Sequence, residues 1–175
     1  MVRSKIIFLD IDGVLNDYYS INGTFLSEYE DRLNTIRKSK LKYVKNKSEI
    51  NDFIVQSFYF DTDKIQLLND IVEKTNSQIV ITSTMRNDKN LIDYFIVRGF
   101  IYSDKIIGIT QFNSEPRGIQ ILNWIEEHNF KGTYLVVDDD SSDIKCYIPD
   151  KNYIKVKGLN DYYKNKIINK LNGGN

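Results

Sequence analysis

The sequence predicts an α/β fold with a three-layer α/β/α arrangement, in which helices cover both faces of a parallel sheet. Short apolar runs rich in isoleucine and valine have the length of buried strands, and segments with apolar residues at helical spacing separate them. Strands that alternate with helices along a chain are typical of such a sheet.

The first strand is predicted over residues 5–10, where the apolar run from Ile6 to Leu9 leads directly into Asp10. The other strands follow the same pattern of a short apolar run bounded by polar residues. They are predicted at 78–84, 106–109, 133–137 and 153–156.

The first helix is predicted to begin at Asp61 or Thr62, with Thr62 as its N-cap, and to end near Lys74. Its apolar stripe recurs at helical spacing: Ile65, Leu67, Leu68, Ile71 and Val72. Three further amphipathic segments predict helices at 89–98, 117–128 and 162–171.

Residues 17–60 carry many charges and few core-type residues. We expect a small, partly helical cap insertion there, within a single domain that spans residues 1–175. Its basic run, which includes Lys38, Lys40 and Lys42, is either a solvated face or a substrate-facing surface. In the second interpretation aromatic side chains add stacking: Tyr43, Phe58, Tyr59 and Phe60.

Composition excludes several functional classes. The formal net charge is +0 at pH 7, so no global field attracts nucleic acid or an anionic membrane, although a local basic groove is compatible with this balance. One cysteine and one histidine rule out an intramolecular disulfide, a cysteine metal cage and a zinc site with paired histidines. No apolar run approaches the roughly 20 residues of a membrane span, and the N-terminus does not resemble a signal peptide. We therefore expect a cytoplasmic protein without membrane association.

Polar side chains follow three of the predicted strands at the point where each strand ends. In chain order these side chains are Asp10 and Asp12, then Thr82, Ser83 and Thr84, then Asp138 and Asp139. The carboxyl ends of parallel strands meet at one edge of a sheet, where ligands bind. Arg117 opens a predicted helix between them. We therefore expect these groups to form one site.

The residue types in this set favour phosphoryl transfer. Asp10 and Asp12 repel each other unless a cation lies between them or one holds a proton. Asp10 is the predicted nucleophile, because a carboxylate can form an aspartyl-phosphate. Asp12 is predicted to protonate the leaving oxygen and then to activate water.

The phosphoryl group needs hydrogen-bond donors and a positive charge. Ser83 is predicted to hold a phosphoryl oxygen through its hydroxyl and backbone N–H, with Thr82 and Thr84 as alternatives one residue away. Arg117 is predicted to neutralise charge that develops on the phosphate.

Magnesium is the expected cofactor, because hard cations prefer oxygen ligands. Its predicted ligands are the carboxylates of Asp10, Asp138 and Asp139 and the backbone carbonyl of Asp12.

These motifs resemble those of the haloacid dehalogenase-like (HAD) superfamily, whose fold is Rossmann-like. Residues 10–14, Asp-Ile-Asp-Gly-Val, resemble its first motif. Residues 79–83 resemble the second motif, a strand that ends in Ser or Thr, and Asp138-Asp139 resembles the acidic fourth motif.

The resemblance leaves two assignments open. The third motif is a single Lys or Arg, for which Arg117 lies at a suitable distance before the acidic pair and Lys131 is the alternative. Variants within the superfamily also make Asp143 an alternative to Asp138 as a metal ligand.

Residues 8–16, 79–86, 117–125 and 136–140 are similar to HAD domains associated with nucleic-acid repair. That group typically has Ser-Ser-Ser-Trp-Arg where this chain has Thr-Ser-Thr-Met-Arg at 82–86, so the tryptophan is missing. The resemblance implies a phosphomonoesterase, with polynucleotide or nucleotide phosphates among its candidate substrates. Arg86 is then either a substrate contact or an ordinary residue at a helix start.

Two other functions fit the same residues. A phosphotransferase shares all of them and differs only in the acceptor. The other is a non-catalytic HAD-like module that binds phosphate or a partner protein, although such a module would not need both Asp10 and Asp12.

Overall fold

The computed structural model describes residues 4–16, 53, 56–57 and 59–174, and it contains a five-stranded parallel sheet with the order β3-β2-β1-β4-β5. The strands are β1 (Lys5–Leu9), β2 (Gln78–Ile81), β3 (Ile106–Ile109), β4 (Thr133–Asp138) and β5 (Tyr153–Lys155). The longer helices are α3 (Thr62–Thr75), α4 (Leu91–Val97), α5 (Arg117–Glu127) and α6 (Asp161–Leu171). Three short 3₁₀ helices complete the described elements: η1 (Thr84–Asn87), η2 (Ser103–Lys105) and η3 (Asp150–Asn152).

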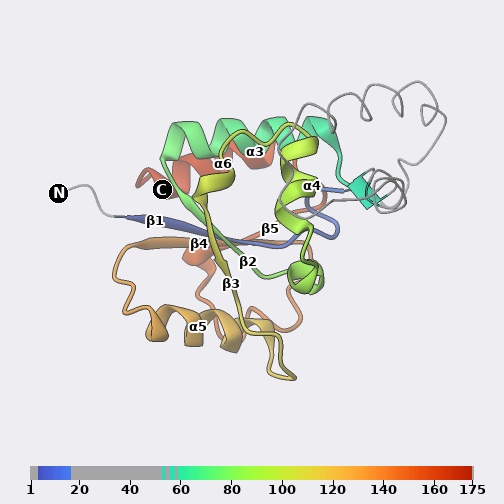
Figure 1. Ribbon diagram of the computed structural model, residues 1–175. Helices are drawn as coiled ribbons and strands as arrows, with labels where there is room; N and C mark the ends of the chain where they lie inside the picture. Colours follow the sequence, from blue (N-terminus) through green and yellow to red (C-terminus); the bar gives the residue numbers. More distant parts are fainter. Residues whose placement is uncertain (1–3, 17–52, 54–55, 58, 175) are drawn as a thin grey trace.

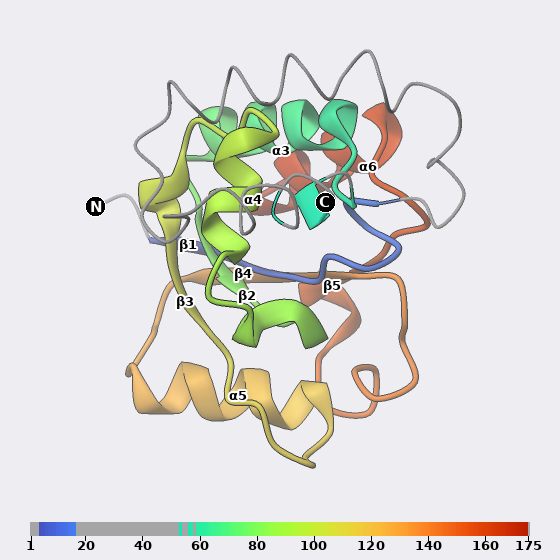
Figure 2. The same ribbon diagram turned by 45° about the vertical axis from the view of Figure 1, so that its right-hand side comes forward.

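Helices cover both faces of the sheet, as Figures 1 and 2 show, with α3, α4 and α6 on one side and α5 on the other. This arrangement confirms the predicted three-layer α/β/α fold. Among the described residues, no helix combines the length and the apolar character that crossing a membrane requires.

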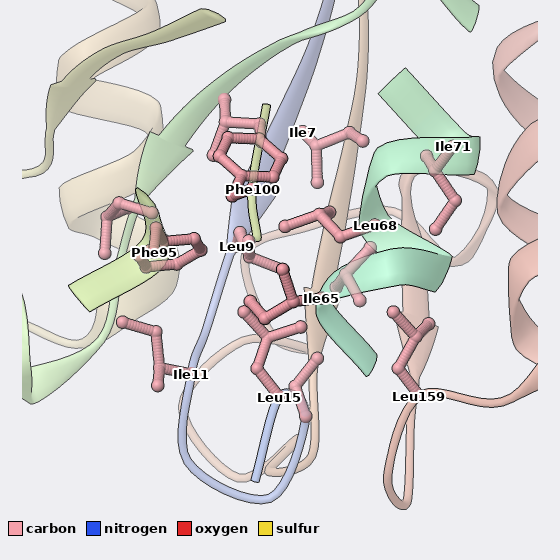
Figure 3. Packing of buried hydrophobic residues seen from close by; sticks show 14 of the residues in the cluster. Ile7, Leu9, Ile11, Leu15, Ile65, Leu68, Ile71, Phe95, Phe100 and Leu159 are labelled. Carbon is pink, nitrogen blue, oxygen red and sulfur yellow. The ribbon is translucent and has the colours of Figure 1, made fainter. Parts of the chain in front are cut away.

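The central strand β1 supplies side chains to both apolar layers. Ile7 and Leu9 belong to the cluster that includes residues of α3, α4 and α6, and Figure 3 shows them beside Ile65 and Leu68 of α3. Phe8 points to the other face and packs with Trp124 of α5. The alternation follows from the two-residue period of a strand, so each face of β1 fixes a different helix layer.

The register of the three middle strands places their polar ends side by side. Leu9 of β1 pairs with Ile81 of β2 and with Val137 of β4. The next residue of each strand therefore begins at the same level of the sheet. The main chain continues the ladder for one more step, because the Asp10 N–H donates to the Val137 carbonyl at 3.0 Å.

Most predicted boundaries lie within two residues of the observed ones, and two of the differences have a clear physical cause. β2 ends at Ile81, three residues earlier than predicted, because the Ser83 hydroxyl accepts a hydrogen bond from the Met85 N–H at 3.3 Å and caps η1. Thr62 is not the N-cap of α3. The Asp61 carboxylate fills that role by accepting from the Asp63 N–H at 2.9 Å.

Most of the predicted cap insertion lies outside the described residues, so the insertion stays a prediction, as does any role of Lys38, Lys40 and Lys42. The end of that segment contributes to the core. Phe60 is fully buried and packs against Phe95 of α4 with ring centroids 5.1 Å apart. The expectation that Phe60 offers a stacking surface to substrate is therefore wrong.

We expect Phe8→Ala to destabilise the protein strongly. Phe8 is fully buried, and its ring contacts Trp124 and Tyr134 edge-on at centroid distances of 5.5 and 6.0 Å. Truncating a buried phenylalanine costs about 3–5 kcal/mol, because a cavity is left behind. Urea denaturation measures the loss, and Leu122→Ala, at a half-exposed position of α5, should cost about 1 kcal/mol or less. Equal losses for the two variants would contradict the assigned packing.

Candidate active site

Asp10 follows β1 directly and is 2% exposed. Its backbone is fixed by the hydrogen bond to Val137, so the carboxylate is held at the central edge of the sheet. Oδ1 of Asp10 is buried without a hydrogen-bond partner among the described residues and lies 3.3 Å from Nη1 of Arg117. A buried carboxylate oxygen in this state can accept an incoming ligand.

The chain turns sharply after Asp12, and glycine is required at the turn. Gly13 has φ +68°, and a Cβ at this position would overlap the carboxylate of Asp139. The Gly13 carbonyl also accepts from the Gly158 N–H at 2.7 Å, which ties the turn to the segment after β5. The turn thereby brings the first and fourth strand ends into contact.

The Asp12 carboxylate is surrounded by hydrogen-bond donors. Oδ1 accepts from the hydroxyl of Tyr59 and from Nδ2 of Asn16, the latter at 3.2 Å. Oδ2 lies 3.5 Å from the hydroxyl of Ser83 and 3.4 Å from that of Thr84. Asp12 thus links the first strand end to the second through its side chain.

The predicted phosphate-binding hydroxyls differ in their surroundings. Ser83 and Thr84 both point toward Asp12, whereas Oγ1 of Thr82 is buried without a hydrogen-bond partner among the described residues. Ser83 is fully buried and Thr84 is exposed. This geometry favours Ser83 or Thr84 over Thr82, and the role of each stays a prediction.

Arg117 is the first residue of α5, and its side chain reaches two strand ends. Nη1 forms ion pairs with Asp138 and with Asp10, while the backbone N–H donates to Oδ2 of Asp143 at 3.1 Å. Burial lowers the pKa of Arg117, but the charges of Asp138 and Asp10 outweigh that effect and raise it above the ordinary value. The guanidinium therefore stays charged.

Three carboxylates gather around this single guanidinium. Oxygen atoms of Asp10, Asp138 and Asp139 all lie within 4.8 Å of one another. Burial is the main cause that raises the pKa of each of the three, and Asp10 raises that of Asp138 further. The cluster carries more negative charge than Arg117 offsets.

A hard divalent cation such as Mg²⁺ fits this group. The donors are all carboxylate oxygens, Oδ1 of Asp10 has no hydrogen-bond partner within the described part of the chain, and the charge excess is negative. Asp143 lies outside the group, because its carboxylate accepts from the first N–H of α5. The geometry thus favours Asp138 over Asp143, while the ligand set stays a prediction.

Arg86 makes contacts that the sequence did not suggest. Nη1 donates to the carbonyls of Thr82 and Ser83 at 2.5 and 2.7 Å, and Nη2 donates to the Gln111 carbonyl at 3.0 Å and to Oε1 of Gln120 at 2.7 Å. Both terminal nitrogens are thus bonded to the protein in a 6% exposed side chain. Direct contact of Arg86 with substrate stays a prediction, and the structure gives it a scaffold role.

Sequence reasoning missed three residues around the site. Asn16 could have been found, because it lies one helical turn after Asp12 and also accepts from the Gly13 N–H at 2.8 Å. The sequence suggests Tyr59 only as a stacking side chain and does not predict its contact with Asp12. Tyr59 and Gln120 are both distant in sequence from the groups they contact, and no local pattern predicts these contacts.

Comparison with known proteins places the chain in a family. Residues 6–160 match the HAD domain in Swiss Army Knife RNA repair proteins. A solved structure of β-phosphoglucomutase from Clostridium difficile is 19% identical and covers 97% of this chain and 98% of its own, with a TM-score of 0.44. No curated protein matches the chain. Because the family match spans most of its length, the chain belongs to the HAD domains of Swiss Army Knife RNA repair proteins.

Proposed function

We propose that the protein is a Mg²⁺-dependent phosphomonoesterase that removes terminal phosphate from polynucleotides through an aspartyl-phosphate on Asp10. The observation that carries the proposal is the meeting of two buried carboxylates, Asp10 and Asp138, with one guanidinium at the centre of the sheet edge. Family membership supports phosphoryl transfer as the reaction class.

In the first step a carboxylate oxygen of Asp10 attacks the phosphorus atom, and the bond from phosphorus to the leaving oxygen breaks. Asp12 donates a proton to that oxygen, so the product leaves as an alcohol. The hydroxyl of Tyr59 and the amide of Asn16 orient the Asp12 carboxylate through its other oxygen. Arg117 stabilises negative charge on the transferring group.

In the second step Asp12 removes a proton from water, and the resulting nucleophile attacks the phosphorus of the aspartyl-phosphate. The bond between phosphorus and the Asp10 oxygen breaks, which regenerates the carboxylate and releases inorganic phosphate. Ser83 and Thr84 hold phosphoryl oxygens beside Asp12.

Asp10, Asp138 and Asp139 would hold the Mg²⁺ ion, together with the backbone carbonyl of Asp12. When bound, Mg²⁺ offsets the repulsion between these carboxylates and the phosphate dianion.

The substrate class rests on the family. Its members are HAD domains of RNA repair proteins. A broken strand can end in a 3′-phosphate, which must be removed before the 3′-hydroxyl can be joined to another end. Terminal phosphates of RNA or DNA are therefore the proposed substrates.

We expect Asp10→Asn and Asp12→Asn each to lower kcat for phosphate release by at least about 10³-fold, because each removes a group that acts in the transition state. Phosphate release is measured with 3′- and 5′-phosphorylated oligonucleotides and with an aryl phosphate in the presence of Mg²⁺. Asp140→Asn is the matched control, since this neighbouring carboxylate is exposed and accepts hydrogen bonds from Ser142 of its own loop.

Full activity of Asp10→Asn would exclude Asp10 as the nucleophile. Failure of the unmodified protein on every phosphorylated substrate would favour the non-catalytic binding module. Transfer of the phosphate to a second alcohol in place of water would identify a phosphotransferase.

We expect Mg²⁺ to stabilise the folded protein, by about 3 kcal/mol at a hundred times its Kd, because the unfolded chain does not assemble the carboxylates. Asp138→Asn should weaken Mg²⁺ affinity by about tenfold or more. Asp143→Asn should leave the affinity unchanged, and it should cost little stability because the amide oxygen can still accept from the Arg117 N–H. Calorimetric titration measures both affinities, and the reverse ranking would make Asp143 the ligand.

We expect the metal-free protein to lose stability as pH rises from about 4 through neutrality. Burial raises the pKa of Asp10 from 3.8 to about 6 and that of Asp138 from 3.8 to about 7. The folded state therefore binds protons more tightly than the unfolded chain over this window, so ionisation costs folding free energy. Denaturation with a chelator present at several pH values measures the slope. Asp138→Asn should flatten it, and stability that rises over the window in the unmodified protein would contradict the prediction.

A further inference from the structure

An exposed aromatic side chain lies close to the candidate active site without a role in it. Phe112 is 60% exposed and lies in the loop that connects β3 with α5. This loop follows the carboxyl end of β3, at the edge of the sheet that carries the site, and projects past the start of α5 in Figures 1 and 2. A single exposed apolar side chain is common in proteins, so the case for Phe112 depends on how its loop is held.

The loop is fastened on both sides of Phe112. Arg86 donates to the Gln111 carbonyl at 3.0 Å, directly before it. Nε2 of Gln120 donates to the Glu115 carbonyl at 2.6 Å and lies 3.4 Å from that of Asn113. These bonds come from buried side chains. The exposed ring is therefore presented by a fixed backbone.

The same arginine connects Phe112 to the phosphate-binding strand end. Its guanidinium carbon lies over the Phe112 ring, 4.8 Å from the centroid, and Nη1 holds the carbonyls of Thr82 and Ser83. One planar guanidinium thus contacts both the Phe112 ring and the backbone of the Ser83 loop. A ligand with a phosphate at Ser83 would therefore have Phe112 nearby.

We infer that Phe112 is a stacking platform for a nucleobase near the phosphate that is removed. Aromatic side chains stack on bases of single-stranded nucleic acid without preference for sequence, because every base has a π-face. The Arg86 guanidinium supports the ring from one side by a cation–π contact and leaves most of it open. This inference rests on the proposed polynucleotide substrate and names a residue that recognises it.

The test compares two RNA strands of equal length that carry a terminal phosphate. One has a base on its terminal nucleotides and the other is abasic there. Binding is measured by fluorescence anisotropy in the Asp10→Asn background with Mg²⁺, so that the strands are not consumed. We expect Phe112→Ala to raise the Kd of the base-bearing strand about 5- to 10-fold, and that of the abasic strand less than about twofold.

Two further variants separate stacking from general apolar contact and from loss of structure. Phe112→Trp should retain the affinity for the base-bearing strand. Phe112→Leu should lose most of the preference for the base-bearing strand over the abasic strand. Ile101→Ala is the matched control, because Ile101 is 72% exposed but precedes β3, at the opposite edge of the sheet. It should bind both strands as the parent does.

An equal rise in Kd for both strands, or none, would overturn the stacking role while the proposed phosphatase function stands. Failure of both the Asp10→Asn parent and Asp12→Asn, which keeps the three carboxylates of the proposed metal site, to bind either phosphorylated strand would overturn both.

Discussion

The ion pairs of Arg117 with Asp10 and Asp138 are the interaction on which the site depends. Two carboxylates buried this close are unfavourable alone, because burial and mutual repulsion disfavour their ionised forms. Nη1 of the Arg117 guanidinium forms an ion pair with each of them, so the ends of β1 and β4 can carry charge inside the protein. The remaining imbalance from Asp139 is what makes a divalent cation chemically suitable here.

The position of the Arg117 guanidinium depends on apolar packing of α5, at a distance from the carboxylates that it contacts. Trp124, two turns along α5, packs edge-on against Phe8 of β1, and this contact holds the helix against the sheet. At the start of the helix, a Cβ on Gly118 would overlap the Tyr147 side chain. The close approach lets Asp143 accept from the Arg117 N–H. Apolar packing thus positions α5, and the cap then aims its first side chain.

The fold could be predicted from the sequence because its signals are local. Each strand is a short apolar run and each helix has an apolar stripe, so their order alone implies a parallel sheet. Asp10, Asp138 and Arg117 could be placed at one edge for the same reason. The contacts of Tyr59 with Asp12 and of Gln120 with Arg86 could not, because they join segments 47 and 34 residues apart through side chains that carry no periodic pattern. The observed end of β2 differs from the predicted one because the Ser83 side chain binds a backbone N–H of the following turn.

The buried hydrogen bonds of Arg86 explain how the loop after β2 stays close to the ends of β1 and β4, although its residues Thr82, Ser83 and Thr84 carry no charge. The Ser83 hydroxyl lies 3.5 Å from Oδ2 of Asp12, which is long for a hydrogen bond. That contact alone would therefore not hold the loop. Arg86 bonds two carbonyls of the loop and also Gln120 of α5. The helix that delivers Arg117 therefore also carries the partner that fixes the Ser83 loop. The Arg117 side chain and the Ser83 loop therefore depend on the same helix, and a shift of α5 would move both together.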